Sequence, residues 1–165
     1  MSGPVRRGRK VPLTGARRPQ SRAASTGFGA KRTDFPMPLR LTLKPHERAI
    51  LGGAVLTNGK HRAELFVETE VPVLRGSDIL SPSAVRTPCE RIVLAIQLMY
   101  VDPQRRDLHE QTYRQLVEDV LDASPSSRRF LDPIDTLVQA GKYYPALKQG
   151  KELLAFERTL LSHVR

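Results

Sequence analysis

The stretch MPLRLTLKP (residues 37–45) alternates leucine with polar residues over most of its length. A period of two is typical of a β-strand that buries one face, because successive side chains point to opposite sides. Pro45 ends the pattern, since proline cannot donate to a strand ladder, and Gly52-Gly53 predicts a turn a few residues later. These residues predict that this part of the chain is built from short antiparallel strands.

Further apolar segments of strand length follow, separated by turn residues: 49–51, 54–57, 61–68 and 71–74. Asn58-Gly59 is the strongest hairpin signal in the chain. Pro72 places the last segment at the edge of a sheet, because its missing N–H would leave a gap in a central strand. Phe66 is the one aromatic residue of this region, and we expect it to pack inward.

Residues 81–165 show the spacing of helices. Ser81-Pro82 is typical of a helix start, and residues 91–100 are apolar on nearly every side, which indicates a buried helix. A second helix is predicted over residues 106–123. A third is expected to end at Gly141, a residue type common just after helices, and a last helix to follow it.

The predicted fold class is therefore α+β, with a small antiparallel β-sheet (residues 37–80) followed by three to four helices (residues 81–165). The helical part would serve packing, dimerisation or the docking of a partner. Residues 1–36 hold nine of the 27 Lys and Arg residues but one of the 17 acidic residues, and lack periodicity, which predicts a disordered basic tail. Either this tail attracts phosphate by counterion release, or it precedes a natural start at Met37 and is an artefact of start-codon choice.

Composition restricts the compartment and the class of protein. Cys89 is the one cysteine, which excludes an intrachain disulfide, and we expect it to be a small buried hydrophobic residue. No apolar stretch approaches the roughly 18 residues of a membrane span. No apolar segment of a secretory signal follows the basic amino terminus. We therefore expect a soluble, cytoplasmic protein that does not engage a membrane.

The motifs of common enzymes are missing from the sequence. The four histidines stand apart from one another, without Cys or carboxylate residues at metal-ligand spacings: His46, His61, His109 and His163. Gly52-Gly53 lacks the Lys-Ser or Lys-Thr of a phosphate-binding loop, and no serine lies in a G-x-S-x-G motif. The sequence thus predicts no enzyme, no metal site and no cofactor.

Seven groups of residues carry a family resemblance, in order along the chain: 37–45, 53–55, 58–59, 72–75 with 78–80, 87–88 with 91–92, 97–100, and 141–148. In order and spacing they resemble the flagellum biosynthesis repressor (FlbT) family, which begins at the position of Met37. The resemblance implies a post-transcriptional repressor that associates with the 5′ untranslated region of flagellin mRNA, lowers its translation and promotes its decay. It also implies action alongside a small helical flagellar activator, FlaF.

A shorter resemblance, covering fewer than 40 residues, concerns the strands. Residues 41–47 followed by Leu51-Gly52 resemble the start of the carbon storage regulator (CsrA) family, and Val73-Leu74-Arg75 with Ile79 resembles its V-x-R-x-x-I segment. Those proteins are small β-strand dimers that bind GGA-containing RNA loops along an edge strand. Lys44 and Arg75 occupy matching basic positions. The sequence departs from the pattern at Leu43, where that family has Arg, and at His46, where it has Gly.

The basic residues of the strand region form the predicted RNA-binding site. Cations at every other position of a strand lie roughly 6 to 7 Å apart, close to the phosphate spacing of single-stranded nucleic acid. The predicted contacts are Arg40, Lys44, Lys60, His61, Arg62 and Arg75. With few aromatic residues available, recognition would rest on arginine stacking, backbone amides and strand-edge hydrogen bonds. An ion pair of Arg75 with Asp78 is the structural alternative for that residue.

A different class of function also fits the sequence. The chain would then be a protein-interaction module that binds a flagellar regulator, a flagellin-related protein or a second copy of itself, without direct RNA contact. Its candidate surfaces are the apolar helix at residues 92–99 and the sheet edge near Pro72. A DNA-binding transcription factor fits less well, because no helix shows a basic recognition face after a short glycine turn.

Overall fold

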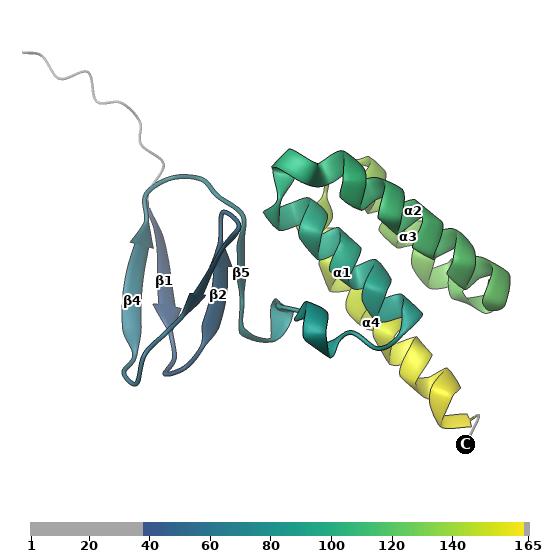
Figure 1. The fold of residues 1–165 in the computed structure, drawn as a ribbon, viewed down its shortest axis with the longest axis horizontal. Helices are drawn as coiled ribbons and strands as arrows, with labels where there is room; N and C mark the ends of the chain where they lie inside the picture. Colours follow the sequence, from purple (N-terminus) through teal and green to yellow (C-terminus); the bar gives the residue numbers. More distant parts are fainter. Residues whose placement is uncertain (1–37, 164–165) are drawn as a thin grey trace, which may run out of the picture. The chain divides into compact units, whose positions relative to one another are not determined.

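A computed structural model describes residues 38–163, so both interpretations of residues 1–36 concern a segment outside the described part of the chain. Within the described part, five β-strands precede four α-helices (Figure 1). This order confirms the predicted α+β class, with strands first and helices in the carboxyl-terminal part.

The strands form two small antiparallel sheets instead of the single sheet expected from the sequence. The strands are β1 (Leu39–Leu43), β2 (Arg48–Leu51), β3 (Ala54–Thr57), β4 (Ala63–Val67) and β5 (Val73–Arg75). One sheet pairs β1 with β4, and the other has the order β3-β2-β5 (Figure 1). The last strand, β5, is thus an edge strand, as the proline before it predicts.

The hairpin turn of the second sheet is at Gly52-Gly53, not at Asn58-Gly59. The two glycines have φ values of +55° and +87°, the left-handed conformations that a two-residue hairpin turn requires. The predicted hairpin at Asn58-Gly59 is wrong, because the strands on either side of it, β3 and β4, belong to different sheets. The side-chain amide of Asn58 instead donates to the carbonyl of Leu43 at the end of β1 and to the loop carbonyls of Lys44 and His61.

Gly53 is expected to tolerate no side chain. Its φ is +87°, and a Cβ atom there would lie 3.2 Å from the carbonyl oxygen of Val101. We expect Gly53→Ala to lower the free energy of unfolding by about 1–3 kcal/mol, measured by urea denaturation. Gly59→Ala is the matched control, because a Cβ at Gly59 has no atom within 4 Å. Equal stability of the two variants would contradict the close approach of this turn to the helices.

The helices begin and end close to the predicted bounds, except at the first start. They are α1 (Pro88–Val101), α2 (Arg106–Ala123), α3 (Arg128–Gln139) and α4 (Tyr143–His163). Residues 82–84 form only a 3₁₀ turn, so the helix start expected at Ser81-Pro82 is wrong. α1 begins instead at a capping box, in which the side chain of Thr87 accepts a hydrogen bond from the backbone N–H of Glu90, and the side chain of Glu90 accepts one from the backbone N–H of Thr87. Gly141, at φ +70°, follows α3 as predicted.

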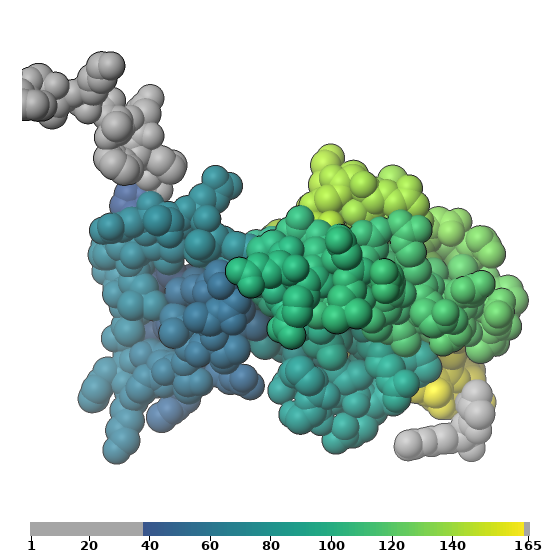
Figure 2. Space-filling view, turned by 45° about the horizontal axis from the view of Figure 1, so that its top comes forward, coloured from purple at the N-terminus to yellow at the C-terminus, as the bar shows by residue number. Residues whose placement is uncertain are grey.

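Two apolar clusters divide the core into layers. Leu41 and Leu43 of β1 pack with Ala49 of β2 in a small cluster between the two sheets. The other face of the second sheet, with Ile50 and Leu74, packs into the large core formed by the helices. In the space-filling view the strand region (blue) and the helices (green) are accordingly in direct contact (Figure 2).

Cys89 lies buried in the helical core, as the sequence predicts. Burial, together with the nearby carboxylate of Glu157, raises the pKa of the thiol to about 12. Cys89 therefore stays protonated at neutral pH and contributes to packing as a small apolar group.

Candidate nucleic-acid interface

The turn between β1 and β2 lies against the loop between β3 and β4, at one end of the two sheets. The backbone N–H of His46 donates to the carbonyl of Gly59 (3.0 Å), and the N–H of Asn58 donates to the carbonyl of Glu47 (2.8 Å). These bonds hold together two basic segments that are separated by a hairpin in the sequence.

We call the resulting group of residues the basic end: Lys44, His46, Arg48, Lys60, His61, Arg62 and Arg75. All except the half-buried Arg75 are exposed. Four of its cations form no ion pair with any other residue of the range 38–163: Lys44, Arg48, Lys60 and Arg62. Unpaired cations gathered at one place attract phosphate strongly.

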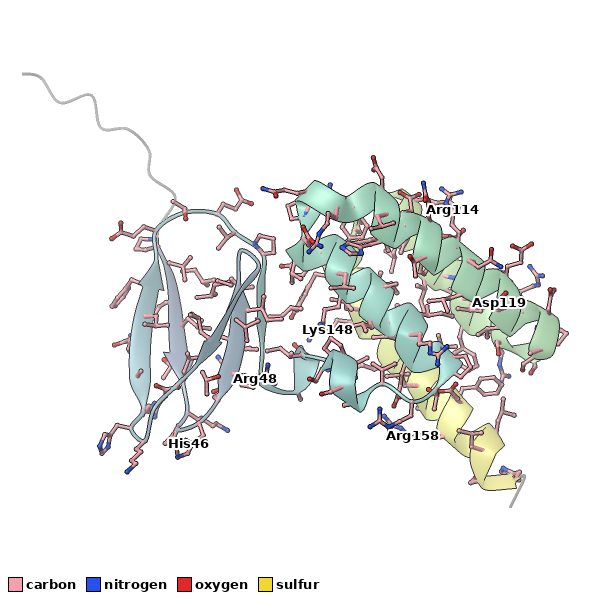
Figure 3. The ribbon with its side chains drawn as sticks, in the orientation of Figure 1. His46, Arg48, Arg114, Asp119, Lys148 and Arg158 are labelled. Atoms are coloured by element: carbon pink, nitrogen blue, oxygen red, sulfur yellow. The ribbon has the colours of Figure 1, made fainter. Side chains whose placement is uncertain are left out.

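Figure 3 labels two residues of the basic end that sequence reasoning did not select, His46 and Arg48. His46 has φ +60°, a left-handed conformation that glycine adopts without strain. This agrees with the glycine that the carbon storage regulator pattern has at this position. No local signal marks Arg48, because its place depends on the pairing of β2 with β3, where it lies opposite Thr57.

Arg75 joins the basic end through an ion pair with Glu47, not with Asp78. Its Nε and Nη2 atoms donate to Glu47 Oε1 (3.0 Å) and Oε2 (3.3 Å), and 42% of the Arg75 side chain remains exposed. A hydrogen bond from the Lys44 N–H, followed by that from Arg75, holds the pKa of Glu47 below its ordinary value. Arg75 therefore anchors the turn while part of its guanidinium faces solvent.

Arg40 does not belong to the basic end. It lies opposite Phe66 on the outer face of the β1–β4 sheet and forms an ion pair with Glu64. Lys44 follows Arg40 by four positions, about 13 Å along a strand. Arg40, one of the predicted RNA contacts, thus lies apart from the basic end, and Glu64 compensates its charge.

Phe66 points outward, and the expectation that it packs inward is wrong. Its side chain is 59% exposed. The pleat of β4 places alternate residues on the inner face, and Leu65 takes the position against the core. An aromatic residue on an outer sheet face follows from this register, which composition alone does not predict.

Most of the stretches that carry the family resemblance meet where the second sheet joins the helices. The amide of Gln97 on α1 is 3% exposed and binds both backbone groups of Leu80: Leu80 N–H donates to Oε1 (2.7 Å), and Nε2 donates to the Leu80 carbonyl (3.0 Å). The N–H of Val73 donates to the Tyr100 hydroxyl (3.3 Å), and the Tyr100 ring packs on Tyr144. These contacts orient the sheets relative to the helices.

Asp78 completes this junction by binding two lysines of α4. Lys148 Nζ and Lys151 Nζ lie 2.8 and 2.7 Å from its carboxylate oxygens. Burial raises the pKa of Asp78, but the hydrogen bonds from the two lysines outweigh that effect and hold the pKa below its ordinary value of 3.8. At pH values above the ordinary pKa of Asp78, its ionised carboxylate therefore contributes to the stability of the fold. This contribution is lost as the pH falls through the lower pKa that Asp78 has in the folded state.

We expect Asp78→Asn to lower the free energy of unfolding by about 1 kcal/mol at neutral pH. The difference from the unsubstituted protein should decrease from neutral pH to the low pH at which Asp78 is protonated in both states. Urea denaturation at both pH values measures this. Asp122→Asn is the control, because Asp122 is exposed and forms no ion pair within the described range. A difference for Asp78→Asn that persists at low pH would contradict the electrostatic origin.

One of the two surfaces predicted for protein docking is not accessible. Ile92, Ile96 and Met99 of α1 are fully buried, so the helix at residues 92–99 offers no docking surface. An apolar pocket of about 330 Å³ lies elsewhere, between the ends of α1, α2 and α4. Leu160 and Leu161, near the end of α4, line it and are exposed.

Two kinds of feature are missing from residues 38–163. Across that range, no three His, Cys, Asp or Glu side chains are grouped so that they would hold a metal ion. None of the helices described has both the length and the apolar character required to cross a membrane.

Known proteins resemble the chain along nearly all of its described part. The sequence profile of the family described as Flagellar protein FlbT matches residues 39–161. A Bradyrhizobium diazoefficiens protein named Probable flagellum biosynthesis repressor protein FlbT 1 is 43% identical over 125 residues, covering 75% of this chain and 85% of that protein. The Probable flagellum biosynthesis repressor protein FlbT of Rhodopseudomonas palustris is 35% identical over 129 residues (76% and 99%). No solved structure matches the chain.

A third relative, the Flagellum biosynthesis repressor protein FlbT of Caulobacter vibrioides, is 32% identical over 130 residues, covering 78% of this chain and 92% of that protein. The family match begins at the first residue of β1 and ends within α4, so it includes both the basic end and the junction. The names of these relatives support a repressor role in flagellum synthesis. The chain belongs to the FlbT family.

Proposed function

We propose that this protein represses flagellin synthesis after transcription, by binding the 5′ untranslated region of flagellin mRNA at the basic end. The observation that carries the proposal is the gathering of exposed cations from three separate loops and strand ends. Each cation that neutralises a phosphate releases condensed counterions, which drives binding to any RNA strand. Specificity would come from arginine planes and backbone groups next to this phosphate contact.

A bound leader explains repression in physical terms. A protein that covers the leader would exclude the ribosome from it, and exposure of the message to nucleases would then follow from the lack of translation. The chemistry of decay belongs to a nuclease under this proposal, because the basic end supplies binding groups only. The protein itself is proposed to act without catalysis and without a cofactor.

A gel shift with flagellin leader RNA tests the proposal. The full chain and a chain lacking residues 1–36 should both shift the leader, and unlabelled leader should compete better than unrelated RNA of equal length. The truncated chain is needed because residues 1–36 hold nine Lys and Arg residues, which attract any RNA. A shift by the full chain alone would assign binding to this segment and overturn the role of the basic end.

Protein docking is a second candidate function, favoured by the apolar pocket between α1, α2 and α4. The exposed Leu160 and Leu161 would receive the apolar face of an amphipathic helix from a flagellar partner of the FlaF type. Co-purification of that partner should then survive nuclease treatment and be lost in Leu161→Asp. Loss of the partner on nuclease treatment would instead support RNA as the link between the two proteins.

A further inference from the structure

A groove of about 590 Å³ lies between the second sheet and the carboxyl-terminal end of α1. Its apolar lining comes from the sheet, from the segment before α1 and from α1 itself: Ile50, Val55, Ile79, Pro82 and Val101. Val55 is 55% exposed although it is apolar. The volume is within the range of small-molecule sites, about 300–1,000 Å³.

The groove is continuous with the basic end through Arg48. Arg48 and Ile50 lie on the same face of β2, because they are two residues apart, and both line the groove. Ile50 packs into the helical core, so this face of the sheet is the one turned toward the helices. On the helix side, Arg105 lines the groove as well. An RNA strand held at the basic end would therefore pass the mouth of the groove.

The lining of the groove suits an uncharged base. The carboxyl-terminal end of α1 carries the negative end of the helix dipole, which repels phosphate but not an uncharged base. The carboxylate of Asp102 beside it is compensated by an ion pair with Arg105 (2.7 Å). A base gains from the apolar lining. Arg48, which forms no ion pair with residues 38–163, would offer its guanidinium plane to the base or its charge to the phosphates that flank it.

The edge strand β3 would supply hydrogen bonds to such a base. β3 is an outer strand in the order β3-β2-β5, and all four of its residues are exposed. Within the range 38–163, the backbone N–H and C=O groups on its outer side are not used in sheet pairing. Free strand-edge groups of this kind match the donor and acceptor pattern on the edge of a base.

We propose that this groove takes one unpaired base of a single-stranded RNA whose phosphates contact the basic end. The proposal rests on the proposed function and adds to it a preference for single strands. Bases in a duplex are stacked and paired, and therefore do not enter a groove of this kind.

Val55→Glu tests the groove, and Ala54→Glu is its matched control. The two substitutions add the same charge at adjacent positions of β3, but Ala54 lies on the opposite face of the strand and does not line the groove. The probes are poly(U) as a single strand and poly(A)·poly(U) as a duplex, measured with the full chain. Val55→Glu should weaken binding of poly(U) about tenfold, the effect of losing one well-held base. Binding of the duplex should stay within about twofold, and Ala54→Glu should leave both unchanged within that limit.

Other outcomes separate this proposal from the proposed function. Equal losses for both variants, or no loss for Val55→Glu while the unsubstituted protein binds poly(U), would overturn the proposal that the groove takes a base. Either result would leave the proposed RNA contact at the basic end unaffected. Failure of the unsubstituted protein to bind any RNA would overturn both. A measurement without substitutions uses methyl NMR with added ribonucleoside monophosphates. Shifts at Val55 and Ile50 would support the groove, and shifts confined to residues outside it would overturn it.

Discussion

Replacing Lys44, Lys60 and Arg62 together by alanine is expected to weaken binding to flagellin leader RNA about 100-fold at about 0.1 M salt. The three cations are exposed and form no ion pair with residues 38–163, so their charge is available to phosphate. Each phosphate contact to a single strand contributes about 0.7 to the slope of log K against log salt. The slope should therefore fall by about 2 as well.

Fluorescence anisotropy at several salt concentrations measures both quantities. It should be done with the full chain and with the chain lacking residues 1–36, because that basic segment would mask part of the loss. The charge-matched control replaces three exposed arginines of the helices by alanine: Arg114, Arg128 and Arg158 (two of them labelled in Figure 3). Equal losses in both triple variants would mean that RNA responds to net charge only, and the basic end would not be the site.

Gln97→Leu is expected to lower the free energy of unfolding by about 3 kcal/mol. The substitution removes both partners of Leu80 at once, leaving its N–H and its carbonyl without hydrogen bonds at a part-buried position. An unsatisfied buried polar group costs about 1–3 kcal/mol. Leucine is similar in volume to glutamine, so packing changes contribute little.

Urea denaturation measures the loss, and hydrogen exchange shows where it acts. Protection of the β5 amides from exchange should fall more than protection of the α2 amides, because Gln97 hydrogen-bonds to Leu80 in the segment that follows β5. Gln111→Leu is the control, since Gln111 is an exposed glutamine on α2, and its effect should stay within about 0.5 kcal/mol. Equal effects of the two substitutions would show that the Leu80 bonds do not hold the junction.

The predictions that failed depended on contacts between residues far apart in the sequence. Asn58-Gly59 has the composition of a hairpin turn, but its asparagine amide binds loop carbonyls and the flanking strands enter different sheets. Phe66 is the one aromatic residue among the strands, and its outward direction follows from the register of β4 against β1. Short-range patterns do not specify which strand becomes the partner, and the register is fixed only once that partner is in place.

From the sequence alone, the α+β order, most helix bounds, the burial of Cys89 and the family resemblance could be inferred, because periodicity, capping residues and motif order are local properties. The tertiary structure alone decided which cations lie close together. Closing two sheets side by side brings Lys44 next to the loop of Lys60 and Arg62, whereas the pairing of β1 with β4 places Arg40 beside the compensating Glu64. The combined attraction of several cations for one phosphate strand depends on the distances between those cations in space. These distances are set only when the strands pair, and local sequence patterns do not specify them.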